Sequence, residues 1–126
     1  MKIPENLKYT KDHEWIKIDG KTGTIGITDY AQGELGDIIY VDIHSTESVK
    51  QGESFGTIEA VKTVSDLYAP VSGRVAEINM NVNENPASVN QDPYGEGWII
   101  KLEISDLKEI EKLMSAADYK KLVGEK

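Results

Sequence analysis

Lys62 occupies the position in this sequence that most clearly suggests chemistry. Gly52 lies ten residues before it and Gly73 lies eleven residues after it. Two short strands of similar length would therefore meet at residues 61–63, which places the lysine at the tip of a hairpin. A modifying enzyme can reach an amine at such a tip, and acylation would remove the charge of that amine.

Two carboxylates flank this lysine in the sequence. Glu59 lies three positions before Lys62, and Asp66 lies four positions after it. Charges of this kind most often serve solubility or recognition by a partner. Most lysines on turns are likewise only solvated charges, so position alone does not assign a reaction to Lys62.

The side chains that most self-contained enzymes need are scarce. The absence of cysteine excludes disulfides, thiolate metal sites and a cysteine nucleophile. His13 and His44 are the only imidazoles and lie 31 residues apart, which excludes a histidine-rich metal site. No Gly-x-Ser-x-Gly elbow is present for a serine nucleophile. We therefore expect no catalytic residue and no metal ligand.

Length, charge and hydropathy narrow the class of protein. The 126 residues are typical of one domain. A net charge of −8 argues against nucleic-acid binding, which needs a basic stripe. The longest apolar run, residues 38–41, is too short to span a membrane, and residues 1–7 lack the apolar region of a signal peptide. We expect a single soluble domain, residues 1–126, in the cytoplasm.

Strand patterns dominate the first hundred residues, and helical patterns dominate the tail. The β-rich or alternating segments are residues 15–18, 22–27, 38–43, 52–60, 64–69, 74–80 and 98–104. A short helical turn is expected over residues 29–36, and residues 83–97 are interpreted as a loop. Apolar residues at helical spacing, with Asp106 and Ser115 as caps, predict a helical extension over residues 105–126.

The segment around Lys62 resembles the attachment segment of biotinyl and lipoyl domains. The resemblance runs over residues 52–75, Gly-Glu-Ser-Phe-Gly-Thr-Ile-Glu-Ala-Val-Lys-Thr-Val-Ser-Asp-Leu-Tyr-Ala-Pro-Val-Ser-Gly-Arg-Val. Further blocks resemble the glycine cleavage system H-protein family, namely residues 8–15, 25–32 with 35–37, and 90–98. Together with residues 59–62, these blocks follow the family's order.

The resemblance implies a fold and a cofactor. The fold is mainly β, a barrel-sandwich hybrid of two small antiparallel sheets related by pseudo-twofold symmetry, with short C-terminal helices. The implied protein is a non-catalytic carrier with lipoate covalently attached to the amine of Lys62. A flexible arm at that point would raise the effective concentration of its dithiolane at partner sites.

The resemblance also implies partner enzymes. The glycine decarboxylase (P-protein) would load an aminomethyl group onto lipoyl-Lys62. The aminomethyltransferase (T-protein) would pass this group to tetrahydrofolate, and dihydrolipoyl dehydrogenase (L-protein) would reoxidise the dithiol. A lipoate ligase or a lipoyl/octanoyl transferase would attach the cofactor. We expect a monomer with no nucleic-acid or membrane partner.

In this family the loaded arm folds into a surface cleft that shields it from water. Glu14, the glutamate after the family's histidine, is the candidate to pair with the ammonium of the arm. The alternative is a surface carboxylate beside a buried Trp15. His13 is expected to pack or to form hydrogen bonds rather than to catalyse, and Glu59 and Asp66 are expected to serve recognition or solubility.

Three alternatives stay open from the sequence. A biotin carboxyl carrier places methionines on both sides of its lysine, where this chain has Val61 and Thr63. A lipoyl domain of a 2-oxoacid dehydrogenase is usually shorter, commonly has aspartate before its lysine and lacks terminal helices. An H-protein that relays lipoyl or octanoyl groups to other proteins would share every feature described above.

Overall fold

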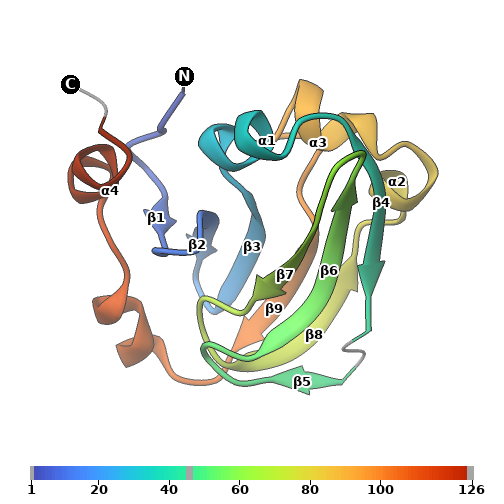
Figure 1. Cartoon of the computed structure of the whole chain (residues 1–126). Helices are drawn as coiled ribbons and strands as arrows, with labels where there is room; N and C mark the ends of the chain where they lie inside the picture. Colours follow the sequence, from blue (N-terminus) through green and yellow to red (C-terminus); the bar gives the residue numbers. More distant parts are fainter. Residues whose placement is uncertain (1, 45–46, 125–126) are drawn as a thin grey trace.

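The computed structural model describes residues 2–44 and 47–124 (Figure 1). The strands are β1 (Lys8–Tyr9), β2 (Glu14–Asp19), β3 (Thr22–Ile27), β4 (Ile38–Ile43), β5 (Ser48–Val49), β6 (Ser54–Ala60), β7 (Val64–Tyr68), β8 (Gly73–Ile78) and β9 (Ile100–Ile104). The helices are α1 (Asp29–Leu35), α2 (Met80–Glu84), α3 (Ala87–Gln91), the 3-10 helix η1 (Leu107–Lys112) and α4 (Ala116–Leu122). No helix among these residues is both long and apolar enough to cross a bilayer.

Two antiparallel sheets form the body of the protein and confirm the predicted mainly β fold. One sheet has six strands in the order β1-β2-β3-β9-β8-β5, and the other has three in the order β4-β6-β7. The sheets therefore differ in size. The larger one includes β1 and β5, which have two residues each and are too short to show a pattern in the sequence.

The main core lies where the inner faces of the two sheets meet. Alternation along the strands sends every second side chain inward, as in β9, where Ile100, Leu102 and Ile104 are all buried. From the smaller sheet, Val41 and Ile58 pair across β4 and β6 and pack into the same cluster. A second, smaller cluster gathers Tyr9, Trp15 and Tyr119 and ties the C-terminal helix to the large sheet.

The prediction that residues 83–97 form a loop is wrong in its first half. Helix α2 begins inside the expected strand 74–80, because the Asn79 side chain accepts a hydrogen bond from the Asn81 N–H and caps a helix. Pro86 then stands directly before α3, where a fixed φ suits the start of a helix. Helix α1 ends as predicted, with Gly36 at a φ of 78°.

The small sheet has no room for a side chain at Gly56. A Cβ atom at this position would collide with the main-chain oxygen of Asp42 on β4. We predict that Gly56→Ala lowers the free energy of unfolding by about 1–3 kcal/mol, as overpacking does elsewhere. Gly33 is the matched control, because nothing lies within 4 Å of a Cβ built there. Urea unfolding should show a large loss for Gly56→Ala and none for Gly33→Ala; equal midpoints would contradict the prediction.

Candidate functional site

Lys62 lies at the tip of the β6–β7 hairpin, in the position that the sequence predicts. Glu59 pairs with Val64 in the last register of the two strands, and the Ala60 N–H donates to the Thr63 carbonyl at 2.8 Å to close the turn. The lysine side chain is exposed. In the described part of the chain it forms no ion pair within 4.0 Å, so its amine is open to a modifying enzyme.

The flanking carboxylates lie on the outer face of the small sheet. Glu59 is paired with Tyr40 on one side and with Val64 on the other, and Asp66 is paired with Thr57. Side chains at paired positions share a face, and Tyr40 and Val64 are 50% and 60% exposed. Both carboxylates therefore belong to an outward surface beside the tip rather than to an enclosed site.

The C-terminal end of α1 lies against the hairpin tip. The Asp37 carbonyl accepts a hydrogen bond from the Val61 N–H at 3.3 Å. A shallow groove of about 340 Å³ runs between residues 33–37 of this connection and Val61 and Lys62 of the turn. The lysine is therefore presented on a surface built from two separate segments.

Glu14 is buried at the start of β2, with 2% of its surface exposed. Its carboxylate accepts a hydrogen bond from the Thr10 hydroxyl at 2.7 Å and another from the Tyr68 N–H at 3.0 Å. Burial raises the pKa of Glu14 to about 8, although both hydrogen bonds lower it. The residue lines a cleft of about 530 Å³ whose rim includes Lys112, Leu113 and Met114.

Lys62 and Glu14 lie at opposite ends of one strand. Glu14 contacts the main chain of Tyr68 at the end of β7, whereas Lys62 lies just before the start of that strand. At a rise of roughly 3.3 Å per residue, these two ends are up to about 20 Å apart. The structure does not bring the two side chains into contact, so only a long flexible group on Lys62 could connect them.

The shifted pKa of Glu14 predicts how stability changes with pH. The pKa of the carboxyl is about 8 in the folded protein against an ordinary 4.5, so the folded state keeps a proton that the unfolded chain releases. The contribution of Glu14 to stability is therefore complete below about pH 4.5 and is lost as the pH rises to about 8. Urea unfolding from about pH 5 to about pH 8 should show wild type losing stability relative to Glu14→Gln. Parallel curves for the two proteins would contradict the raised pKa.

His13 belongs to a structural network rather than to the cleft. Its Nδ1 atom forms a hydrogen bond with the Tyr119 hydroxyl at 2.8 Å, and that hydroxyl also contacts the Thr28 hydroxyl at 2.7 Å. The imidazole packs against Tyr30 at 4.7 Å between ring centroids. Burial lowers the pKa of His13, and its φ of 68° is unusual for a residue other than glycine. These contacts fix the turn that leads into Glu14.

Two residues of this site carried no prediction from the sequence: Thr10, whose hydroxyl contacts the Glu14 carboxylate, and Tyr119, which forms a hydrogen bond with His13. Tyr119 lies 106 residues from His13 in the chain, and no sequence spacing signals such a contact. Thr10 belongs to a block that resembles the H-protein family. The resemblance marked this position, but it did not indicate a contact with Glu14.

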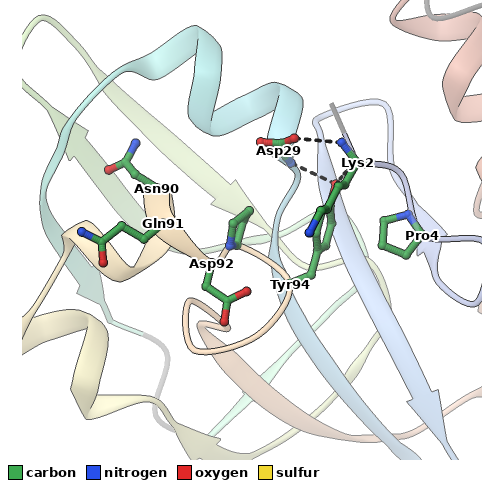
Figure 2. A pocket seen from close by; sticks show the side chains of 8 residues that line it. Lys2, Pro4, Asp29, Asn90, Gln91, Asp92 and Tyr94 are labelled. Carbon is green, nitrogen blue, oxygen red and sulfur yellow. Dashed lines mark hydrogen bonds between the residues drawn. The ribbon is translucent and has the colours of Figure 1, made fainter.

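A further pocket of about 520 Å³ lies between the N-terminal residues and the end of α3 (Figure 2). The Tyr94 hydroxyl donates to the Lys2 carbonyl at 2.7 Å and accepts a hydrogen bond from the Asp29 N–H at 3.0 Å. The Lys2 N–H in turn donates to the Asp29 carboxylate at 2.9 Å. None of the predicted site residues lines this pocket, and the hydrogen bonds among Lys2, Asp29 and Tyr94 hold the N-terminal segment against the start of α1.

Comparisons with known proteins identify the family. The family model for the glycine cleavage H-protein matches residues 7–126. The chain belongs to the glycine cleavage H-protein family. Among relatives, it is 52% identical over 126 residues to the glycine cleavage system H protein of Staphylococcus carnosus, covering 99% of this chain and 100% of that one. The corresponding protein of Carboxydothermus hydrogenoformans is 53% identical over 124 residues, covering 98% of this chain and 95% of that one.

The fold agrees with this assignment. A crystal structure of a glycine cleavage system H protein from Mycobacterium marinum superimposes with a TM-score of 0.88 at 38% identity, covering 96% of this chain and 98% of that one. The H-protein family model also matches the segments outside residues 52–75. A biotin carboxyl carrier or an isolated lipoyl domain would not account for those segments. Membership in the H-protein family supports a lipoyl-carrier role in the glycine cleavage system and implies P-, T- and L-protein partners.

Proposed function

We propose that lipoate is attached through an amide to Lys62 and that this protein is a non-catalytic shuttle. It carries the aminomethyl group from the glycine decarboxylase (P-protein) to the aminomethyltransferase (T-protein), and reduced lipoate to dihydrolipoyl dehydrogenase (L-protein). The observation that supports this most is the single lysine at the tip of the β6–β7 hairpin, exposed and unpaired among the described residues, in a chain of this family.

The residues at the tip fit the attachment of lipoate. Acylation requires a free amine that an attaching enzyme can enclose. Lys62 is exposed, and its neighbour in the turn is Val61, an uncharged residue that is 69% exposed. When attached, lipoate supplies a dithiolane that accepts the aminomethyl group and two electrons. The hairpin keeps the attachment point away from the core, so that the stem is free to turn toward different partners.

The cleft around Glu14 is proposed as the resting place of the far end of the arm. A buried carboxylate can hold a cationic amine through a charge-assisted hydrogen bond. An ammonium group beside Glu14 would favour the ionised carboxylate and lower its raised pKa. The Thr10 hydroxyl and the Tyr68 N–H already orient the carboxylate, so little rearrangement is needed when the cation arrives.

Reconstitution with the partner enzymes tests this proposal. Lipoylated protein should support glycine decarboxylation by the P-protein and transfer to tetrahydrofolate by the T-protein. The same protein without lipoate is the matched control and should support neither reaction. Equal rates for the two forms, or no reaction with the lipoylated form, would contradict the proposed role.

A further inference from the structure

The turn that presents Lys62 has few contacts outside its own hairpin. Among the hydrogen bonds of residues 2–44 and 47–124, a single one links residues 61–63 to another segment, from the Val61 N–H to the Asp37 carbonyl at 3.3 Å. Ala60, just before the turn, also pairs with Ile38 on β4, so both links from the turn to the neighbouring segment lead to residues 37 and 38.

Asn90 fixes the main chain on both sides of Asp37. Its Nδ2 atom donates to the Gly36 carbonyl at 2.8 Å, and its Oδ1 atom accepts from the Ile38 N–H at 2.9 Å. Nδ2 also donates to Oε1 of Gln32 at 3.0 Å. A main-chain N–H can only donate and a carbonyl can only accept, so these partners fix the orientation of the amide.

These three hydrogen bonds, here called the Asn90 brace, join α3 to the connection between α1 and β4. Figure 2 shows Asn90 on α3, close to the ribbon that leaves α1. In this connection Gly36 has a φ of 78° and β4 begins at Ile38, so residues 36–37 belong to neither the helix nor the strand.

We propose that Asn90 is a positioning residue for the acylation of Lys62. This inference rests on the proposed function, in which Lys62 carries lipoate. The brace fixes residues 36–38, the Asp37 carbonyl holds the Val61 N–H, and the adjacent Lys62 is thereby presented to the attaching enzyme in one orientation. Asn90 does not contact the acylated amine and acts only through the main chain between them.

Asn83 offers a matched control. Its Nδ2 atom also donates from a short helix to β4, reaching the Val41 carbonyl at 2.7 Å. Val41 pairs with Ile58 in the middle of the β4–β6 pairing, away from the turn. Asn83→Ala therefore removes a comparable side-chain hydrogen bond to the same strand without releasing residues 36–38.

Two measurements on the full chain test the proposal. Hydrogen exchange of the Val61 and Ile38 amides should speed up by about tenfold in Asn90→Ala, the factor that corresponds to about 1.4 kcal/mol, and should stay at the wild-type rate in Asn83→Ala. With a purified lipoate ligase, lipoate and ATP, kcat/KM for the acylation of Lys62 should fall about threefold to tenfold in Asn90→Ala only, mainly through KM.

Asn90→Asp keeps the test decisive if the alanine variant does not fold. Aspartate preserves the acceptor for the Ile38 N–H and removes both hydrogen bonds that Nδ2 donates, to the Gly36 carbonyl and to Gln32. Amide exchange at Val61 should therefore be faster in Asn90→Asp, as it is expected to be in Asn90→Ala. The comparison is between Asn83→Ala and Asn90→Ala, or Asn90→Asp if the alanine variant does not fold. If the two proteins have the same rate of Val61 amide exchange and the same rate of acylation, the proposal is overturned. A wild-type protein that takes no lipoate at Lys62 would contradict the proposed function instead, and exchange at Val61 would still decide whether the brace holds the turn.

Discussion

Replacing Lys62 with arginine should abolish lipoate attachment and with it all carrier activity. Arginine keeps the positive charge and the length of the side chain, but its guanidinium is not acylated as an amine is. The hairpin tip is exposed, and surface substitutions of this kind usually change stability by less than about 0.5 kcal/mol. The variant should therefore fold normally and show no lipoyl mass increase after incubation with a ligase, lipoate and ATP.

Lys21→Arg is the control for this substitution. Lys21 is also an exposed lysine in a hairpin turn, between β2 and β3. It should be lipoylated like wild type, because Lys62 is intact. Attachment of lipoate to the Lys62→Arg variant would show that another lysine is the acceptor.

Glu14→Gln should shorten the lifetime of the loaded carrier by about tenfold to a hundredfold. Glutamine keeps the size of the side chain and removes the charge that would hold the cationic amine. A hydrogen bond to a charged group is worth about 1.5–3 kcal/mol, and each 1.4 kcal/mol is about a tenfold change in rate. Loading by the decarboxylase should change much less, because it takes place at the partner's active site.

The measurement is the release of formaldehyde and ammonia from protein loaded by the decarboxylase, with no T-protein present. Asp66→Asn serves as the matched control, because Asp66 is an exposed carboxylate on the same strand that ends at the cleft. It should release its group at the wild-type rate. Equal half-lives for wild type and Glu14→Gln would mean that Glu14 does not hold the amine.

The hairpin that carries Lys62 could be predicted because local signals agree. Turn-forming residues lie at the ends of both predicted strands. The observed strands β6 and β7 leave residues 61–63 as the turn, as expected. The mainly β fold followed in the same way from short alternating segments. Helices α2 and α3 were missed because five residues each are too few to show a helical period.

The surroundings of Glu14 could not be predicted, because they depend on contacts that are distant in the chain. The Tyr68 N–H that binds its carboxylate lies 54 residues away. Asn90 lies 52 residues from Ile38, from whose N–H it accepts a hydrogen bond. Asn90 belongs to a block that resembles the family, but the resemblance did not indicate this contact. Sequence patterns assign a residue to a strand or a turn, whereas the packing of separate segments decides which polar groups meet.

Mapping the modification on wild-type protein shows whether Lys62 is the residue that carries lipoate. The full chain should be incubated with a lipoate ligase, lipoate and ATP, and then analysed by intact mass and by sequencing of proteolytic peptides. We expect one lipoyl group per chain, located on Lys62 and on no other lysine. An unmodified chain, or a lipoyl group at another lysine, would contradict it.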